Sequence, residues 1–184
     1  MSMVNSWIET ELGDFKLRFA KVEDVPLILT FIRELASYEN LLDEVVATEK
    51  GLRESLFERK VAEVIIGEFK GEPVGFALFF HNFSTFVGKP GIYLEDLYVK
   101  PEMRGKGIGK IMLSFLGKLA VERKCGRLEW WCLNWNEPSI QFYKRMGAVP
   151  MEEWTVYRVT DNALDHLAGE FNGKSKQDKE SKSE

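Results

Sequence analysis

The chain has 184 residues, of which 45% are hydrophobic and 29% are charged, and its net charge is −4 at pH 7. This length suits one globular domain with a sizeable core and leaves little room for a second full domain. An acidic chain is poorly suited to duplex DNA, whose phosphates attract basic proteins, so nucleic acid is not an expected partner. A cationic small molecule agrees better with the charge.

The sequence lacks the features of a membrane or secreted protein. No run of eighteen apolar residues occurs, and the first twenty residues carry several charges where a signal peptide would be apolar. We therefore expect a cytoplasmic protein that makes no membrane contact. The only cysteines, Cys125 and Cys132, are too few for a disulfide framework, and the two histidines lack metal-ligand spacing. We expect reduced thiols and no metal.

The first half of the chain contains strand and helix patterns. Apolar and polar residues alternate over 15–19, as in a half-buried strand. Asp24 can cap a helix whose apolar residues follow the 3.6-residue period, at Val25, Ile28, Leu29, Ile32 and Leu35. Thr48 begins a shorter helix through Phe57, and a hairpin follows with strands at 61–69 and 74–80 around a turn at 70–73. The second arm is almost entirely apolar, which indicates a central strand.

The second half predicts a strand at 92–99, a helix at 108–119 and a strand at 127–133. Asn136 can cap the next helix, which Gly147 closes. A strand at 155–159 and a helix at 162–171 follow, and the polar residues 172–184 are expected to be a disordered tail. Hairpins first and strand–helix alternation later predict an α+β fold, a mixed and mostly antiparallel sheet with helices on both faces. Residues 1–171 would form its single domain.

The run Arg104-Gly105-Lys106-Gly107-Ile108-Gly109 is the most informative motif. Glycines at a helix start let a ligand approach the backbone, whose unpaired N–H groups and helix dipole favour a phosphate. The spacing fits neither the P-loop nor the dinucleotide fingerprint, because Lys110 and Met112 stand where each needs a glycine. A plain surface turn is the alternative reading. The strand before the run and the helix after it favour the anion cradle.

The motif Arg-x-x-Gly-x-Gly after a strand resembles the pyrophosphate-binding motif of the Gcn5-related N-acetyltransferases. Further segments resemble the spermidine/spermine and thialysine acetyltransferases within that superfamily, and these segments are residues 34–39, 93–96, 136–139 and 142–147. The resemblance covers roughly residues 15–171 and implies the acetyltransferase fold. Residues 130–131 and 151–154 match the family only loosely, and they belong to the region that would shape the acceptor pocket.

The resemblance implies acetyl-CoA as the acetyl donor. The pyrophosphate would meet the backbone N–H groups of the glycine run and nearby basic side chains, and the pantetheine arm would lie along the strand at 97–99. The expected cofactor-binding residues are therefore Leu97, Tyr98, Val99, Arg104, Gly105, Lys106, Gly107, Ile108, Gly109, Lys110, Asn136 and Tyr143. Lys110 can equally be a solvated helix residue, and Asn136 a helix cap alone.

The resemblance also implies the chemistry of transfer to an amine. Tyr143 would protonate the departing thiolate, and Glu95 would take the proton of the amine, directly or through a water. Tyr38, Glu39, Glu95 and Glu153 would bind a small cationic amine. A regular strand would point Asp96 to the side opposite Glu95, so we expect a structural role for Asp96.

These residues predict an N-acetyltransferase for a small di- or polyamine or a thialysine-like amino acid. Two alternatives remain open: acetylation of a protein lysine or N-terminus, and a binding module that holds acetyl-CoA without chemistry. The family's polyamine branch forms homodimers, and the resemblance implies the same here, with the apolar residues of 154–159 as a candidate contact.

Overall fold

The computed structural model describes residues 7–177. The chain divides into two compact units, residues 1–142 and 143–184, which we describe separately. One domain over residues 1–171 therefore stays a prediction. No helix within residues 7–177 is long and apolar enough to cross a bilayer.

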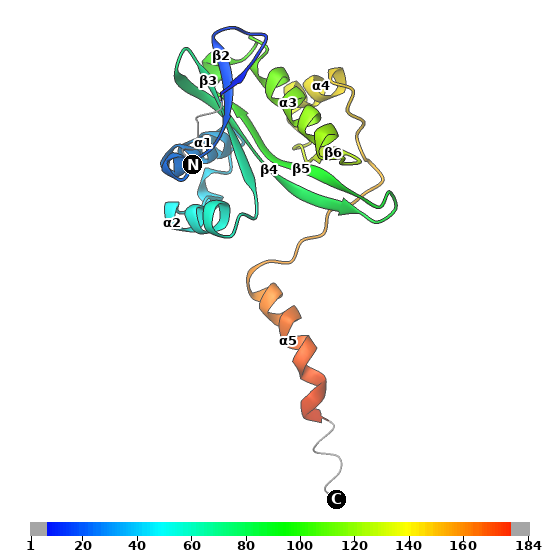
Figure 1. Cartoon of the computed structure of the whole chain (residues 1–184). Coiled ribbons are helices and arrows are strands. Elements are labelled where there is room, and N and C mark those ends of the chain that lie inside the picture. The colour runs from blue at the N-terminus through cyan, green and yellow to red at the C-terminus, as the bar shows by residue number, and fades with distance from the viewer. Residues whose placement is uncertain (1–6, 178–184) are drawn as a thin grey trace, which may run out of the picture. The chain divides into compact units, whose positions relative to one another are not determined.

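The first unit is built on a six-stranded sheet with the strands in sequence order (Figure 1). Neighbouring strands are antiparallel except for the last pair, β5 and β6, which is parallel. The predicted mixed and mostly antiparallel sheet is thereby confirmed. The strands are β1 (Ile8–Glu9), β2 (Phe15–Phe19), β3 (Glu63–Phe69), β4 (Glu72–Ser84), β5 (Lys89–Val99) and β6 (Leu128–Trp130).

Helices cover both faces of this sheet, as the sequence predicts. α1 (Val25–Tyr38) and α2 (Glu49–Arg53), which continues as a π-helical turn at Glu54–Glu58, lie on one face, and α3 (Ile108–Glu122) lies on the other (Figure 1). Short 3₁₀ turns occur at Val22–Asp24, Leu42–Glu44 and Pro101–Met103. α4 (Glu137–Arg145) runs across the boundary between the two units, and α5 (Asp161–Gln177) belongs to the second.

Two apolar layers hold the sheet between its helices. On the α1 face, Phe31 stacks on Phe76 with ring centroids 5.5 Å apart, inside a buried cluster with Tyr98. On the α3 face, a Cβ at Gly67 would lie 2.7 Å from the Phe15 ring and 3.5 Å from the sulfur of Met112. Glycine is required at residue 67, because protein interiors are too closely packed for that Cβ.

A β-bulge interrupts the pairing of β4 with β5. Leu78 faces Asp96 and Phe79 faces Leu94, so Glu95 is an extra residue without a partner on β4. Such a bulge bends the strand locally and re-aims side chains, and bulges are common beside active sites. The bulge was not predicted from the sequence, because it depends on the register between β4 and β5.

Two local predictions differ from the structure, and one short strand is additional. Asp24 makes no side-chain cap to α1, because its carboxylate accepts from Lys21 N (2.7 Å) and pairs with Arg18. The short strand β1 was not predicted. The strand predicted at 155–159 is absent, since that segment has no regular structure and no described strand pairs with it. A strand forms only where a neighbour satisfies its backbone groups.

The last predicted helix is present and longer than expected. α5 ends at Gln177, six residues inside the segment expected to be a disordered tail. The remaining residues, 178–184, lie outside the described part of the chain.

Candidate functional site

The glycine run forms a left-handed turn into α3. Gly105 and Gly107 have φ angles of +75° and +86°, and Gly107 is the N-cap residue. Ile111 N makes the first helical bond, to Gly107 O (3.0 Å). Within residues 7–177, no acceptor pairs with the backbone N–H groups of residues 105–110. These donors sit at the positive end of a helix dipole, which is the arrangement that binds a phosphate.

Gly109 keeps the start of α3 open for a ligand. A Cβ at this position would meet Phe142 at 3.8 Å and Val99 at 4.0 Å, which are ordinary contacts. Packing within the protein would therefore tolerate a side chain at residue 109. A ligand that lies close to the backbone would not, because the side chain would occupy the ligand's space. A glycine at this position therefore fits a pyrophosphate bound at the helix start.

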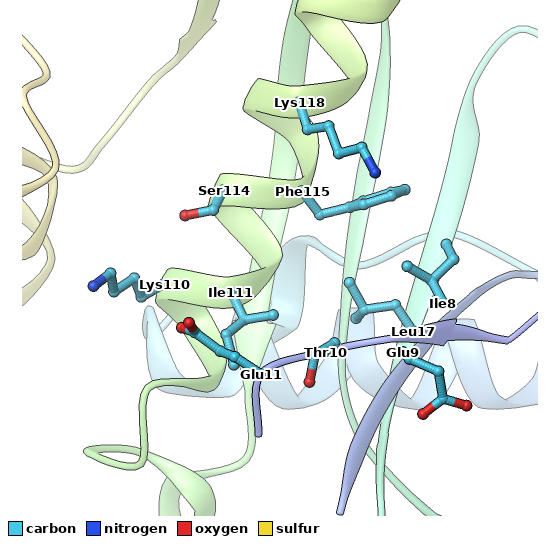
Figure 2. Close-up of a pocket in the computed structure, with 10 residues that line it drawn as sticks. All are labelled: Ile8, Glu9, Thr10, Glu11, Leu17, Lys110, Ile111, Ser114, Phe115 and Lys118. Carbon is cyan, nitrogen blue, oxygen red and sulfur yellow. The ribbon is translucent and has the colours of Figure 1, made fainter. Parts of the chain in front are cut away.

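The basic side chains of the run have different surroundings. The Arg104 guanidinium lies near the Tyr38 ring and donates from Nε to Val99 O (2.9 Å). The Lys106 ammonium lies 3.4 Å from the Met103 sulfur. Lys110 is exposed and extends to the opposite side of α3 from Phe115 (Figure 2). All three remain within reach of solvent at the helix start.

A groove of about 450 Å³ runs between α3 and the β1–β2 arm (Figure 2). Ile8, Leu17, Ile111 and Phe115 line it, with charged side chains around them. Lys110 is the one residue that it shares with the predicted site. The groove is thus separate from the residues that the sequence assigns to chemistry.

The strand before the glycine run has an open edge. Lys100 N donates to Val74 O on β4 (2.9 Å). Because successive residues of a strand direct their backbone groups to opposite edges, Leu97 and Val99 direct theirs away from β4. β6 pairs with β5 only up to Leu94, so no described strand covers this edge. An extended ligand can add here as a short strand, with its hydrogen bonds made to the backbone.

The side chain of Tyr98 does not lie at the open edge of β5. Its ring is buried, at 4% exposure, in the α1-facing core. Burial and the neighbouring Glu34 carboxylate raise the pKa of the Tyr98 phenol to about 12. Its hydroxyl therefore stays protonated at neutral pH.

The bulge at Glu95 brings carboxylates together. It breaks the strict alternation of β5, so the premise that placed Asp96 opposite Glu95 does not hold at this point. Burial, together with the negative charges of Glu95 and Glu39, raises the pKa of Asp96 to about 7. Glu95 is exposed, whereas Asp96 and Glu39 are half-buried. Burial likewise raises the pKa of Glu39.

Cys132 lies beside this group, a neighbour that the sequence did not reveal. Burial and the charge of Glu39 raise the pKa of its thiol. Cys125 and Cys132 are both free. A raised thiol pKa makes Cys132 a poor nucleophile at neutral pH, so we assign it no part in the chemistry.

Tyr38 and Asn136 are joined. The Tyr38 hydroxyl donates to Asn136 Oδ1 (3.2 Å), and Trp135 lies against the Tyr38 ring with centroids 6.2 Å apart. Asn136 is buried and also accepts from Ser139 N (3.4 Å), so it does cap α4. Trp135 was not among the predicted residues.

The remaining predicted residues belong to the second unit. Tyr143 is in α4, and its carbonyl accepts from Met146 N (3.0 Å) and Ala148 N (3.1 Å) at the helix end. Gly147 has a φ of +87° there, as predicted for a closing glycine. Glu153 is exposed in a segment without regular structure. Among the described residues, no group of three His, Cys, Asp or Glu side chains could hold a metal ion.

Comparison with known proteins agrees with this geometry. Residues 31–148 match the acetyltransferase (GNAT) family. The chain belongs to this family. GNAT acetyltransferases transfer an acetyl group, so the chain is an acetyltransferase enzyme, as the sequence predicted.

Individual relatives match most of this GNAT chain. Thialysine N-epsilon-acetyltransferase of Bos taurus is 38% identical over 83% of this chain and 96% of its own. Spermidine/spermine N(1)-acetyltransferase-like protein 1 of Homo sapiens is 32% identical over 88% of this chain and 25% of its own. An integron cassette protein from the mobile metagenome of V. cholerae has a similar structure, with a TM-score of 0.72 and 27% identity over 84% of this chain and 98% of its own.

The half-buried carboxylate of Asp96 predicts an unusual pH dependence of stability. With its pKa raised from 3.8 to about 7, the folded state holds a proton that the unfolded state releases, so stability falls as pH rises from 4 to 7. Asp96→Asn should remove this loss and stabilise the protein at pH 8 by on the order of 2–4 kcal/mol, with little effect at pH 4. Thermal unfolding at both pH values measures it. Asp43→Asn, at an exposed carboxylate, is the control, and an equal shift at both pH values would contradict the assignment.

Proposed function

We propose that this GNAT chain transfers the acetyl group of acetyl-CoA to a primary amine of a small di- or polyamine or a thialysine-like amino acid. The single observation that carries the choice of acceptor is the group of carboxylates Glu39, Glu95 and Asp96, which lies at the strand with the open edge. A protonated amine, or an acceptor with a second ammonium, is attracted to such a group. The names of the thialysine and spermidine/spermine relatives support the same class.

The donor would be held by backbone groups. The six N–H groups of residues 105–110 suit the pyrophosphate, and Arg104, Lys106 and Lys110 supply positive charge nearby. Leu97 and Val99 would pair with the pantetheine arm. The N–H of Leu97 would then also polarise the thioester carbonyl and stabilise the oxyanion that forms on it.

The acceptor amine must lose a proton before it attacks, because an ordinary primary amine has a pKa of about 10. Glu95 would accept that proton, directly or through a water. Its position on the bulge, exposed and without a partner on β4, leaves it free to face an acceptor. Asp96, which is half-buried beside it, would attract the positive charge of the amine in its ionised form.

The amine nitrogen then bonds to the acetyl carbon, and the tetrahedral intermediate breaks its carbon–sulfur bond. The products are the amide and the coenzyme A thiolate, which takes a proton from Tyr143. A phenol with a pKa of about 10 protonates a thiolate with a conjugate pKa of about 8.5 at an expense of roughly 2 kcal/mol, which is small enough for a positioned acid. Asn136 would fix the start of α4, the helix that carries Tyr143.

Homodimerisation remains our proposal from the resemblance to the polyamine branch. In the second unit, Trp154, Val156 and Tyr157 are exposed at 70%, 52% and 91%. A second copy of the chain is a suitable cover for such apolar side chains. The mass measured by light scattering at micromolar concentration tests the proposal, and a monomer would contradict it.

Thiol release from acetyl-CoA tests the proposed acceptor. We expect selective turnover of a member of the small-amine set, which comprises spermidine, spermine, putrescine, thialysine and lysine. A lysine-bearing peptide is the comparison substrate. Turnover of the peptide alone would move the protein to protein acetylation. Binding of acetyl-CoA without release of thiol for any amine would indicate a binding module.

A further inference from the structure

The end of α1 connects the two sides of the candidate site through one side chain. The Arg104 guanidinium lies 4.4 Å from the centroid of the Tyr38 ring, a close cation–π contact. The Tyr38 hydroxyl donates to Asn136 Oδ1 at 3.2 Å. Tyr38 thus contacts the first residue of the glycine run with its ring and the cap of α4 with its hydroxyl.

Contacts with other residues of the chain hold the Arg104 side chain in place before any ligand binds. Besides Tyr38, its guanidinium lies 5.8 Å from the Tyr98 ring, and its Nε donates to Val99 O. The Tyr98 ring is itself held in place, because it is only 4% exposed within the core cluster that faces α1. An arginine with one face on aromatic rings keeps its remaining N–H groups aimed in one direction.

This arrangement gives the residues between Val99 and Gly105 little freedom. Val99 belongs to the open edge of β5, and Gly105 begins the series of unpaired N–H groups. Arg104 connects Val99 with Gly105, because it precedes Gly105 in the chain and its side chain donates to the Val99 carbonyl. If Arg104 loses its aromatic support, the loop must be ordered when the donor binds, and that ordering reduces affinity.

We propose that Tyr38 is a positioning residue for the acetyl donor, which holds Arg104 at the start of the glycine cradle through its ring and anchors Asn136 through its hydroxyl. The inference rests on the proposed function, because it takes the cradle as the donor site. It differs from a wall of the acceptor channel, the role that the resemblance gives to Tyr38. A channel wall affects the amine, whereas a support for Arg104 affects coenzyme A in the absence of any amine.

Calorimetric titration of coenzyme A into the whole protein tests the proposal without an acceptor. Tyr38→Leu removes the ring and the hydroxyl, and we expect its dissociation constant to rise about tenfold, between the effects typical of exposed and of desolvated cation–π contacts. Tyr38→Phe keeps the ring and should bind coenzyme A within about twofold of the wild type. Tyr38→Trp also keeps a ring and should bind in the same way.

A double-mutant cycle separates support of Arg104 from a general structural effect. Arg104→Met removes the charge, and Tyr38→Leu should then have little further effect on the dissociation constant, because its partner is already gone. Phe86→Leu, which changes an aromatic side chain with 95% exposure in the turn between β4 and β5, is the matched control and should bind normally. Thermal unfolding of each variant reports folding. Tyr38→Gln replaces the leucine variant if that variant does not fold.

The results of these experiments distinguish failure of the inference from failure of the proposed function. Additive losses in the cycle, or normal coenzyme A binding by Tyr38→Leu together with a raised KM for the amine, would overturn the inference and leave the proposed function in place. Equal losses in Tyr38→Phe and Tyr38→Leu would assign the effect to the hydroxyl and overturn the role of the ring. Failure of the wild type to bind coenzyme A would overturn the proposed function and this inference with it.

Discussion

Gly107→Val should abolish binding of acetyl-CoA, with a rise in the dissociation constant of at least about 100-fold. Two physical effects combine. The φ of +86° at Gly107 is costly for a β-branched residue, by about 1–3 kcal/mol, so the turn into α3 would distort. The new side chain would also occupy the space that the phosphate needs, and each lost charge-assisted bond contributes about 1.5–3 kcal/mol. Calorimetry with acetyl-CoA measures the loss.

A second glycine of the same helix provides the control. Gly117 lies inside α3, and a Cβ there would meet nothing within 4 Å. Gly117→Ala should therefore bind acetyl-CoA normally and gain about 0.5–1 kcal/mol of stability from the better helix propensity. Unchanged binding by a folded Gly107→Val protein would reject the phosphate cradle. A loss of the fold in both variants would show that α3 tolerates no change.

Tyr143→Phe should lower kcat by about 100-fold or more and leave the affinity for acetyl-CoA within about twofold, if the hydroxyl serves as the general acid. Removal of one oxygen keeps the ring and its packing, so the variant isolates the proton donor. The lost acid also predicts a changed dependence on the leaving group, because a thiol of lower pKa needs less help to depart. Steady-state thiol release and calorimetry together separate turnover from binding.

Tyr157→Phe is the matched control for this variant. Tyr157 belongs to the same unit of the chain and is 91% exposed. Loss of its hydroxyl should leave both kcat and binding unchanged. A large loss of acetyl-CoA affinity in Tyr143→Phe would make Tyr143 a binding or packing residue, and normal turnover would remove it from the mechanism.

Much of the fold followed from local patterns. Each of these patterns can be recognised within one short segment of the chain. They are the 3.6-residue period of α1, the apolar run of β4 and the glycines before α3. The strand expected at 155–159 was wrong for a related reason. Its β-branched and aromatic residues suit a strand, but a strand also needs a neighbour, and composition does not say whether one is present.

The candidate site was predicted unevenly. The anion cradle is contiguous in sequence, so its glycines, its basic residues and the helix after it could be identified together. Asp96 was assigned a structural role because a regular strand alternates its faces. The β-bulge depends on the pairing of β4 with β5, and no local pattern records it.

The sequence by itself determined the enzyme family, the mixed and mostly antiparallel sheet and the glycine turn at the start of α3, because helix periodicity and glycine conformation are properties of short segments. Only the tertiary structure decided which side chains meet. The charge of Glu39, at the end of α1, acts on the pKa of Asp96 in β5, and Tyr38 contacts Arg104 with its ring while its hydroxyl donates to Asn136. Contacts between distant segments, and the pKa shifts that burial brings, arise from packing and register, which exist only once the chain has folded.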